Sequence, residues 1–368
     1  MRAALNLVYL LPGETGGMET YARELIPRLA ARDVELTALV SRAAAGEDFG
    51  CATVVVPVDA RNRVDWVRGE QQHVPRLAQR AGADVLHSLA STAPLHGRVP
   101  RVTTIHDLAY KLVPETHFGL LGLGMGVLVP AAARRSRRVI ADSKSTARDL
   151  NTHLGLSPER IDVVPLGVSP PAAAAVDTAA LRTELELGER PVLLSASAKR
   201  PHKNIARLLD ALARIAPERR PVLVVPGYPT AYEVELRRHA AALALGDDVV
   251  FPAWLSGAQM EGLYALSTAV VFPSLYEGFG LPVLEAMARD VPVACSDRSS
   301  LPEVAGDAAL LFDPEDVGAI QRSIERLLAD APLRERLRAA GRERAAAFTW
   351  ERTADGTLRS YERALRAT

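Results

Sequence analysis

The sequence predicts an α/β protein with two doubly wound, Rossmann-like domains in tandem, each a parallel sheet covered by helices on both faces. The chain of 368 residues is longer than one ordinary hydrophobic core supports. Short apolar runs of strand length alternate with longer segments of helical spacing, which is typical of buried parallel strands. This alternation stops at a proline-rich break near residue 170 and then begins again.

Seven apolar runs in the first half of the chain have the length of strands. They are Ala3–Tyr9, Leu36–Val40, Thr53–Val56, Val85–His87, Val102–Thr104, Val139–Ala141 and Ile161–Val164. Helical spacing is found between several of them, at Met18–Ala31, Val67–Arg80 and Thr146–Asn151. No run reaches the length of a membrane span. The apolar segment 119–133 comes closest, but glycines and Pro130 interrupt it.

The break at Pro170-Pro171 enforces an extended path and separates the two sets of strands. Six further runs follow it: Val192–Ser195, Val222–Val225, Val249–Phe251, Ala269–Phe272, Val291–Ala294 and Ala309–Phe312. We therefore predict a first domain over 1–168, a linker with a short helix over 169–188 and a second domain over 189–349. Asp177 or Thr178 is the expected cap of the short helix. A last helix over 350–368 is expected to return to the first domain.

Composition excludes several classes of protein. The formal net charge is zero, which argues against a nucleic-acid partner held by phosphate neutralisation. The two cysteines, Cys51 and Cys295, offer neither a disulfide framework nor metal spacing, so we expect a cytoplasmic protein. The basic run 134–138 follows apolar sequence. We interpret it as a solvated helix end, with peripheral contact at an anionic inner membrane face as the alternative.

The stretch 273–286 carries most of the functional information. The expected strand Ala269–Phe272 leads into a loop with Glu277 and two glycines, and a helix opens near residue 281 with Glu285 about one turn in. Such a loop before a helix N-terminus forms an anion site, because free amides meet the positive end of the helix dipole there. Carboxylates do not bind an anion, so we expect both to accept hydrogen bonds from hydroxyl groups of a phosphate-linked sugar.

Glu277 and Glu285 are also the residue type of a glycosidase pair. Such a pair needs one protonated carboxyl beside the bond that breaks. The cations and amides expected beside these residues would keep both carboxylates ionised. We therefore exclude the hydrolase interpretation.

Three cations, Lys199, Arg200 and Lys203, lie between the first strand of the second domain and the helix Ile205–Ile215. A helix N-terminus disfavours cations unless an anion is bound among them. A diphosphate would fit, with Arg giving forked hydrogen bonds and Lys a point charge. The alternative is a solvated loop.

Two features of the first domain are candidate ligand contacts. Gly16 and Gly17 precede the first helix and would let the backbone approach a ligand closely, with simple turn chemistry as the alternative. The glycine spacing does not fit the Gly-x-Gly-x-x-Gly of nicotinamide sites. His106 follows the strand Val102–Thr104 at its carboxyl end, where ligands bind in such sheets, and its alternative role is structural. His87 is interpreted as a core or rim histidine.

The two glutamates, separated by seven residues, belong to a longer recognisable run. It reads Tyr276-Glu277-Gly278-Phe279-Gly280-Leu281-Pro282-Val283-Leu284-Glu285-Ala286-Met287 and resembles the signature of retaining glycosyltransferases of family 4, which have the GT-B fold. Further stretches resemble family landmarks in the same order, at 16–21, 104–108, 141–143, 163–168, 200–204 and 299–308. The resemblance covers nearly the whole chain and implies two domains that face a central cleft.

The resemblance also implies roles for the candidate residues of the second domain. Glu285 would hold the ribose hydroxyls of a nucleotide sugar, and Arg200 and Lys203 would hold the diphosphate. Many members place Gly-Arg where this chain has Ser197-Ala198, so either Lys199 or Arg200 would be the second cation. The donor hexose would be held by Glu277 and by the loop residues Gly278, Phe279, Gly280 and Leu281.

In the first domain, the resemblance implies that Gly16 and Gly17 approach the phosphate and that His106 contacts the sugar near its C6 hydroxyl. The predicted function is retaining transfer of a mannose- or glucose-like hexose from a UDP- or GDP-sugar to an acceptor hydroxyl. In front-face attack the departing phosphate oxygen would take the acceptor's proton. Asp-x-Asp is absent, so neither a metal nor another cofactor is expected.

Three alternatives stay open at this point. The chain could be a sugar-nucleotide 2-epimerase of similar fold, a natural-product glycosyltransferase that uses a dTDP- or UDP-sugar, or a nucleotide-sugar binder without catalysis. The sequence does not identify the acceptor, which could be a saccharide, a lipid-linked sugar or a small molecule, nor the oligomeric state.

Overall fold

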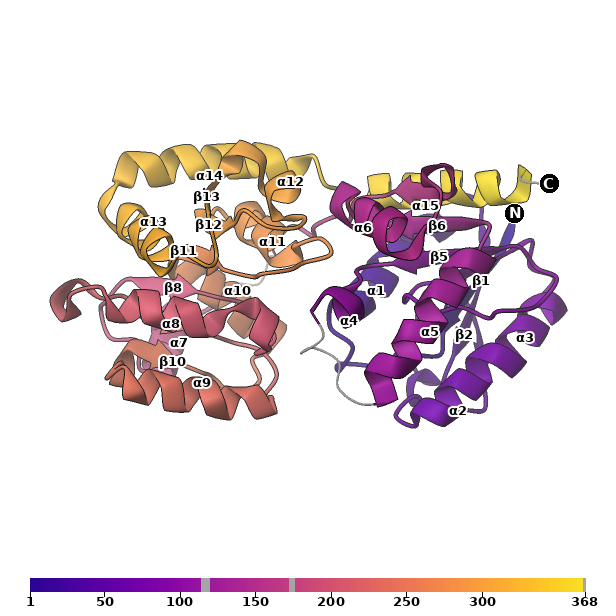
Figure 1. Ribbon diagram of the computed structural model, residues 1–368, viewed down its shortest axis with the longest axis horizontal. Coiled ribbons are helices and arrows are strands. Elements are labelled where there is room, and N and C mark those ends of the chain that lie inside the picture. Colours follow the sequence, from indigo (N-terminus) through magenta and orange to yellow (C-terminus); the bar gives the residue numbers. More distant parts are fainter. Residues whose placement is uncertain (114–119, 172–175, 367–368) are drawn as a thin grey trace. The chain divides into compact units, whose positions relative to one another are not determined.

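The computed structural model describes residues 1–113, 120–171 and 176–366, which form two compact units. Unit 1 comprises Met1–Gly167 and Thr349–Thr368, and unit 2 comprises Val168–Phe348 (Figure 1). The last helix therefore belongs with the first half of the chain. Within the described ranges, no helix combines the length and the apolarity needed to cross a bilayer.

Unit 1 is built on a seven-stranded parallel sheet in the order β3-β2-β1-β4-β5-β6-β7. The strands are β1 (Arg2–Leu7), β2 (Glu35–Val40), β3 (Ala52–Val55), β4 (Val85–Ser88), β5 (Arg101–Ile105), β6 (Arg138–Ala141) and β7 (Ile161–Val163). Each predicted strand is confirmed, with ends shifted by at most two residues. The order reverses between β1 and β4, so the carboxyl ends of these two strands mark a ligand-binding position typical of open α/β sheets.

Helices cover both faces of this sheet. They are α1 (Gly17–Ala30), α2 (Arg63–Arg68), η2 (Gly69–His73), α3 (Val74–Arg80), α4 (Ala109–Leu112), α5 (Leu120–Arg135), α6 (Lys144–Leu154) and α15 (Trp350–Arg366). Successive residues of a strand point to opposite faces. Leu86 of β4 packs in a core cluster with Val74 and Ala78 of α3, whereas the next residue, His87, contacts Tyr361 of α15.

The helical segment predicted at Val67–Arg80 is longer in the structure and less regular. It begins at Arg63 because the side chain of Asn62 caps the amides of Val64 and Asp65 at 3.1 and 3.2 Å. The π-helical turn η2 then joins α2 to α3. Such turns are rare and occur often at functional sites. The apolar segment 119–133 becomes part of α5, apart from Gly119, which lies outside the described residues.

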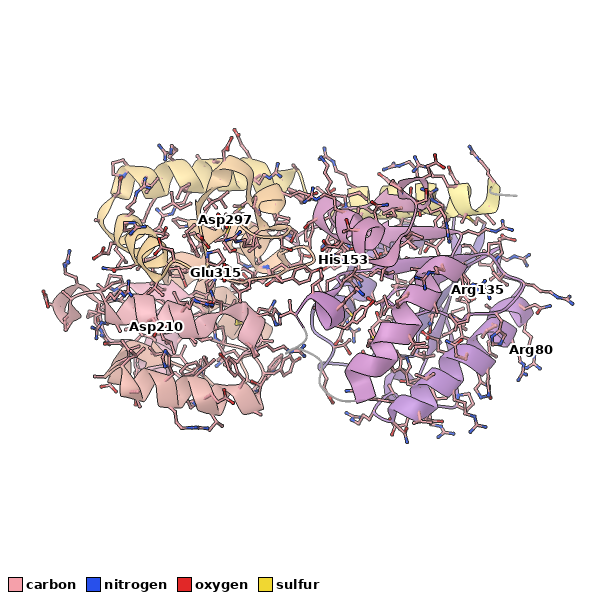
Figure 2. All side chains as sticks on the ribbon, in the orientation of Figure 1. Arg80, Arg135, His153, Asp210, Asp297 and Glu315 are labelled. Atoms are coloured by element: carbon pink, nitrogen blue, oxygen red, sulfur yellow. The ribbon has the colours of Figure 1, made fainter. Side chains whose placement is uncertain are left out.

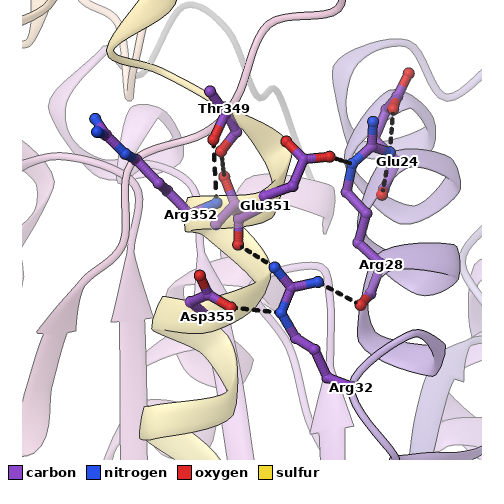
Figure 3. A network of polar contacts seen from close by, with 8 residues as sticks. Glu24, Arg28, Arg32, Thr349, Glu351, Arg352 and Asp355 are labelled. Atoms are coloured by element: carbon purple, nitrogen blue, oxygen red, sulfur yellow. Dashed lines mark hydrogen bonds and ion pairs between the residues drawn. The ribbon is translucent and has the colours of Figure 1, made fainter.

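The C-terminal helix α15 packs against α1 through apolar contacts, including Tyr21 against Trp350, and through the polar contacts drawn in Figure 3. Trp350 and Tyr361 of α15 are almost fully buried. The Arg28 guanidinium contacts Glu351 at 2.8 Å, and Arg32 pairs with Asp355 and donates a hydrogen bond to the Glu351 carbonyl at 2.8 Å. These partly exposed pairs set the register of two helices that are distant in sequence, while the buried aromatics supply most of the stabilisation.

Unit 2 contains a six-stranded parallel sheet in the order β10-β9-β8-β11-β12-β13. The strands are β8 (Val192–Leu194), β9 (Val222–Val224), β10 (Val249–Val250), β11 (Ser267–Phe272), β12 (Val293–Ser296) and β13 (Ala309–Phe312). All six predicted strands are confirmed, again within two residues. The order reverses between β8 and β11, so the loops after these two strands occupy the corresponding ligand-binding position.

The helices of unit 2 alternate with its strands. They are α7 (Thr178–Glu184), η5 (Pro201–Lys203), α8 (Ile205–Ala213), α9 (Ala231–Ala242), α10 (Gly257–Leu266), α11 (Leu281–Ala288), α12 (Leu301–Ala305), α13 (Val317–Ala329) and α14 (Ala331–Ala346). The short helix α7 is capped by Asp177, whose carboxylate accepts a hydrogen bond from the Ala180 amide at 2.9 Å. It packs on α10 within unit 2. The alanines at 172–175 lie outside the described residues.

Candidate functional site

Lys203 and Glu277 form an ion pair across the loops that follow β8 and β11. The Lys203 Nζ lies 2.6 Å from Glu277 Oε1, and both side chains are largely buried, with 16% and 11% of their surface exposed. The ammonium also lies 5.7 Å from the centre of the Phe272 ring. The sequence assigned the two residues to different groups of a ligand, whereas the structure joins them directly.

Asn204 holds these two loops together. Its backbone adopts a left-handed conformation with φ 59°, which ends η5 and starts α8. Its side-chain amide donates hydrogen bonds to the carbonyls of Pro273 and Pro314 at 3.1 and 2.8 Å. The Leu275 amide in turn donates to the His202 carbonyl at 2.8 Å. The position of Lys203 beside Glu277 is therefore fixed by backbone contacts on both sides.

The glycine-bearing loop ends where α11 begins, at Leu281, as the sequence predicted. Gly280 precedes the helix with φ 109°, and a Cβ at this position would lie 2.6 Å from the Leu301 Cδ2. Only glycine fits here without displacing Leu301. At the start of α11, Pro282 has no N–H group and the Val283 amide donates to the Gly280 carbonyl at 3.0 Å. The Leu281 amide and the positive end of the helix dipole are the features that suit an anion.

Two serines that the sequence reasoning did not assign, Ser299 and Ser300, hold this loop from the side of β12. The Ser300 hydroxyl donates to the carbonyls of Glu277 and Phe279 at 3.0 and 2.7 Å. The Ser299 hydroxyl accepts a hydrogen bond from the Glu277 amide at 3.2 Å. Their place within the family-like stretch 299–308 was the available signal, but only the structure shows which backbone groups they bind.

Glu285 lies about one turn into α11, and its Oε2 accepts a hydrogen bond from the Tyr264 hydroxyl of α10 at 3.1 Å. Glu261, also on α10, holds the Arg289 guanidinium at 2.8 and 2.5 Å. Burial raises the pKa of the Glu285 carboxyl, and the nearby charge of Arg289 offsets this only in part. Desolvation is therefore the larger influence on the pKa of Glu285, ahead of the neighbouring charges.

The structure distinguishes Lys199 from Arg200, the two alternatives that the sequence left for the second diphosphate cation. Lys199 is almost fully buried, and its ammonium lies 2.7 Å from the Gly227 carbonyl and 3.2 Å from the Glu233 carboxylate. Desolvation lowers the pKa of Lys199, while Glu233 acts in the opposite direction. Arg200 is exposed, and its guanidinium makes no ion pair or hydrogen bond with any described residue. Arg200 is thus the one of the two that is available to a ligand.

Acidic side chains also follow β12 and β13, where Asp297 and Glu315 are labelled in Figure 2. They surround Arg298, which contacts Asp297, Asp313 and Glu315 at 3.3, 3.0 and 3.7 Å. All four side chains are substantially exposed, so the cluster is a solvated ion-pair network of small energetic weight. Across the described part of the chain, no three His, Cys, Asp or Glu side chains converge as a metal site would require.

In unit 1, the candidate residues Gly16 and Gly17 stand at the start of α1. Gly16 has φ 60° and ψ −133°, a combination that side chains disfavour, and Gly17 is the first helical residue. Both are exposed, and a Cβ at Gly16 would meet no atom within 4 Å. The loop is held by Thr15, whose hydroxyl lies 2.8 Å from both the amide and the carbonyl of Leu11.

His106 follows β5, and both of its ring nitrogens are occupied. Nδ1 lies 2.6 Å from Asp142 Oδ2, and Nε2 lies 2.8 Å from the Leu89 carbonyl. A carboxylate and a carbonyl only accept, so this geometry suits an imidazolium, in which both nitrogens donate. Burial opposes the charge, but the Asp142 carboxylate outweighs it and raises the pKa of His106. A ring N–H bond to a sugar hydroxyl would therefore have to replace one of these contacts.

His87 is the structural histidine that the sequence predicted. It is fully buried, and its ring nitrogens contact the hydroxyls of Tyr361 and Thr104, each at 2.8 Å. Burial lowers the pKa of His87 to about 3, so this ring is neutral. The surroundings of the two histidines thus shift their pKa values in opposite directions.

Comparison with known proteins fits this architecture. The profile described as Glycosyltransferase Family 4 matches residues 15–170, and the profile described as Glycosyl transferases group 1 matches residues 177–344. The D-inositol 3-phosphate glycosyltransferase of Frankia alni is 31% identical over 96% of this chain and 96% of its own length.

The chain belongs to glycosyltransferase family 4.

A second relative of this glycosyltransferase is the MMP alpha-(1→4)-mannosyltransferase of Mycolicibacterium hassiacum, 34% identical over 63% of this chain and 56% of that protein. Among solved structures, sucrose-phosphate synthase from Thermosynechococcus elongatus superposes with a TM-score of 0.81 at 21% identity, over the full length of both chains. HepE of Anabaena, solved with UDP and glucose, gives a TM-score of 0.78 at 20% identity over 98% of this chain and 99% of its own. These likenesses confirm the GT-B fold.

Proposed function

We propose that this glycosyltransferase moves a mannose- or glucose-like hexose from a nucleoside diphosphate sugar to an acceptor hydroxyl, with retention of the anomeric configuration and without a metal ion. The observation that carries the proposal is the Lys203–Glu277 pair beside the N-terminus of α11. It places a cation, an anion site and a hydroxyl acceptor in two adjoining loops. The relatives named for mannosyl and glycosyl transfer, and the neighbour solved with UDP and glucose, support it.

In unit 2, each group has a role that its chemistry suits. Lys203, Arg200 and the N-terminal end of α11 hold the diphosphate. Glu277 and the loop Gly278–Leu281 hold the hexose, and Glu285 accepts hydrogen bonds from the ribose. Lys199 is reassigned to a structural role, because Glu233 and the Gly227 carbonyl already occupy its ammonium. In unit 1, Gly16 and Gly17 are proposed for the phosphate and His106 for the hexose.

Catalysis then consists of stabilising the leaving group and holding both reactants. The bond from the anomeric carbon to the phosphate oxygen breaks while the acceptor oxygen bonds to the same face of that carbon. The departing diphosphate takes the acceptor's proton, so no protein base is needed. Positive charge from Lys203, Arg200 and the α11 dipole disperses the negative charge that develops on the diphosphate, which is the task of a metal ion in other transferases.

We also propose that the reaction takes place in the cytoplasm. Cys51 and Cys295 are both free thiols, and Cys295 is buried. Free thiols persist in a reducing compartment. Within the basic run 134–138, the Arg138 guanidinium donates two hydrogen bonds to Asp162 and is therefore already occupied.

The test is to measure nucleoside diphosphate release from UDP-, GDP-, ADP- and dTDP-hexoses with and without a panel of acceptors, in the presence of EDTA. We expect release from one donor that depends on an acceptor, survives EDTA and gives a product with the donor's anomeric configuration. Release that is equal without acceptor would instead indicate the epimerase. Binding without any turnover would indicate a nucleotide-sugar binder, and restoration of activity only by Mg²⁺ or Mn²⁺ would exclude the metal-free mechanism.

A further inference from the structure

His106 is held at both ring nitrogens, but its two partners differ in kind. The Asp142 carboxylate lies 2.6 Å from Nδ1 and has 2% of its side-chain surface exposed, whereas the imidazole has 16%. The partner of Nε2 is the neutral Leu89 carbonyl at 2.8 Å. A hydrogen bond between two charged groups is stronger than one from the same ring to a neutral carbonyl, and burial increases the difference. The Leu89 contact is therefore the one that a ligand replaces at lower cost.

The Asp142 carboxylate is committed to this ring. Its Oδ2 contacts Nδ1 of the histidine, while its Oδ1 is buried and accepts no hydrogen bond from any described residue. A buried oxygen without a donor is costly and calls for an explanation other than stability. The residue precedes the Ser143 cap of α6, where the positive end of the helix dipole favours a negative charge. Within the described ranges, this carboxylate serves the histidine alone.

Other titratable side chains near the His106 ring contribute less to its charge. Tyr21 of α1 packs edge-on against the ring, with the ring centres 5.1 Å apart, and burial raises the pKa of its hydroxyl. His87 of β4 is neutral, because burial lowers its pKa to about 3. Asp107 caps the Ala109 amide at 2.8 Å and raises the pKa of His106 less than the ion-pair partner does. The charge of the ring therefore depends mainly on one carboxylate.

The backbone on both sides of this contact is fixed independently of the imidazole. The loop after β4, which supplies the Leu89 carbonyl, is held by the Thr92 hydroxyl, which donates to the Glu70 carboxylate at 2.9 Å. On the other side, the Thr146 hydroxyl of α6 donates to the His106 carbonyl at 3.2 Å. The imidazole can thus turn away from the Leu89 carbonyl while both backbone segments stay in place.

We propose that Asp142 is a positioning residue that keeps the Nδ1–H of His106 while the Nε2–H changes its partner from the Leu89 carbonyl to a hydroxyl group of the donor hexose. This inference rests on the proposed function, which assigns His106 to the hexose. A hydroxyl group accepts from the ring and donates to the freed carbonyl at the same time, so neither buried group is left unpaired. A charged ring also binds the hydroxyl more tightly than a neutral ring would.

The first test is calorimetric binding of the full chain to its preferred nucleoside diphosphate hexose and to the same nucleoside diphosphate without the sugar. Exchanging a charge-assisted hydrogen bond for a neutral one typically weakens binding by about 5- to 10-fold. We expect Asp142→Asn to weaken binding of the hexose donor by this factor and of the nucleoside diphosphate by less than twofold. The matched control is Asp107→Asn, which should leave both affinities within twofold, because this carboxylate caps a backbone amide.

A positioning residue acts only through its partner. Asp142→Asn should therefore weaken donor binding by less than twofold when it is introduced into His106→Gln. The deficit of Asp142→Asn relative to wild type should also narrow from pH 8 to pH 5, because a histidine without its carboxylate becomes protonated below the ordinary pKa near 6.5. A carboxylate with a merely structural role would show neither behaviour.

Nitrogen-15 NMR of the wild-type imidazole tests the same inference without a substitution in the core of unit 1. The hexose donor should shift the Nε2 signal of His106 more than the Nδ1 signal, and the nucleoside diphosphate alone should shift neither. A shift of Nδ1 in place of Nε2 would mean that the Asp142 contact is the one that is exchanged, which would overturn the inference.

Four results with Asp142→Asn would also overturn the inference while leaving the proposed function intact. These are unchanged binding of the hexose donor, an equal loss for the nucleoside diphosphate, losses that add in the double variant with His106→Gln, and a deficit that does not change with pH. If the wild-type chain bound no nucleoside diphosphate hexose, the proposed function itself would fail.

Discussion

The ammonium of Lys203 lies 2.6 Å from the carboxylate of Glu277, although 74 residues separate them in the chain. The pair is largely buried and sits between loops that Asn204 and the backbone of Leu275 hold together. A diphosphate that binds Lys203 would share the cation with Glu277, which keeps that carboxylate oriented. Under the proposed function, Lys203 acts on the donor and its charge holds Glu277 in position.

This arrangement predicts that Lys203→Met impairs catalysis far more than folding. Removing one preorganised donor to developing charge typically lowers turnover by about 10²- to 10³-fold, and we expect a loss in kcat of that size. Lys199→Met should instead lower stability more than kcat, because the buried Lys199 ammonium forms an ion pair with Glu233. Breaking a buried pair costs up to about 3–5 kcal/mol, less here because Arg237 also contacts Glu233.

The measurements are kcat and the denaturant midpoint for both variants, with the exposed Lys111→Met as a control that should match the wild type in both. If Lys203→Met were the less stable of the two buried-lysine variants and kept its kcat, Lys203 would be structural and the assignment would have to be abandoned.

Gly280→Ala is expected to damage the start of α11. The residue has φ 109°, and its new methyl group would lie 2.6 Å from the Leu301 side chain. A non-glycine residue at a strained backbone position typically costs about 1–3 kcal/mol. Relief of the clash with Leu301 would also move the backbone at the start of α11, where the diphosphate is proposed to bind. Donor affinity should fall at least tenfold by calorimetry. Gly257→Ala at the start of α10 is the matched control, since open space surrounds that position and its φ is not positive. Equal affinity in both variants would contradict the account.

His106 and His87 should differ in charge at neutral pH. Asp142 raises the pKa of His106, so its ring stays protonated above the ordinary range, whereas burial lowers the pKa of His87 to about 3. The contribution of the charged His106 to stability is therefore present below the unfolded-state pKa near 6.5 and is lost as pH rises through its raised pKa. Nitrogen-15 NMR of the imidazole rings at pH 7 should show one imidazolium and one neutral ring. Asp142→Asn should convert the first into a neutral ring; two neutral rings in the wild type would refute this assignment.

The raised pKa of the Glu70 carboxyl predicts that the free energy of unfolding falls between pH 5 and pH 8. This carboxyl is buried in the turn η2, where it accepts hydrogen bonds from Asn6 and Thr92, each at 2.9 Å. Burial raises its pKa from 4.5 to about 7. The folded state then binds more protons than the unfolded state between these values, so the free energy of unfolding declines across that window, by about 3 kcal/mol at most.

The measurement is chemical denaturation of wild type and Glu70→Gln at pH 5 and pH 8. The variant cannot ionise at this position, so its stability should decline less with pH, whatever its absolute value. Glu35→Gln, at an exposed position, should keep the wild-type slope. A wild-type slope in Glu70→Gln would show that Glu70 titrates as an ordinary carboxyl.

The strands were predictable because a parallel strand buried on both faces reads as a continuous apolar run, as at Val222–Val224 and Ala269–Phe272. The start of α2 was not predictable from apolar spacing, because it depends on the Asn62 side-chain cap, which lies in a polar stretch of the sequence. The π turn at Glu70 carries no apolar spacing of its own. In both cases local backbone hydrogen bonding, rather than hydrophobic periodicity, determines the structure.

For the site, the sequence supplied the residue types and the loops but not their partners. It could not tell whether Lys199 or Arg200 is exposed, because adjacent side chains leave a loop in different directions. It could not show the Lys203–Glu277 contact, which depends on the register of two loops after β8 and β11. Nor could it show that Glu285 is desolvated against Tyr264, because that requires the packing of α10 on α11.

The central claim is that Lys203 acts on the diphosphate of a nucleotide-sugar donor. The most direct measurement is calorimetric binding of the preferred nucleoside diphosphate hexose to wild type, Lys203→Met and Lys111→Met. We predict that wild type and Lys111→Met bind with the same affinity and that Lys203→Met binds at least tenfold more weakly while remaining folded. Equal binding by all three proteins would contradict the claim.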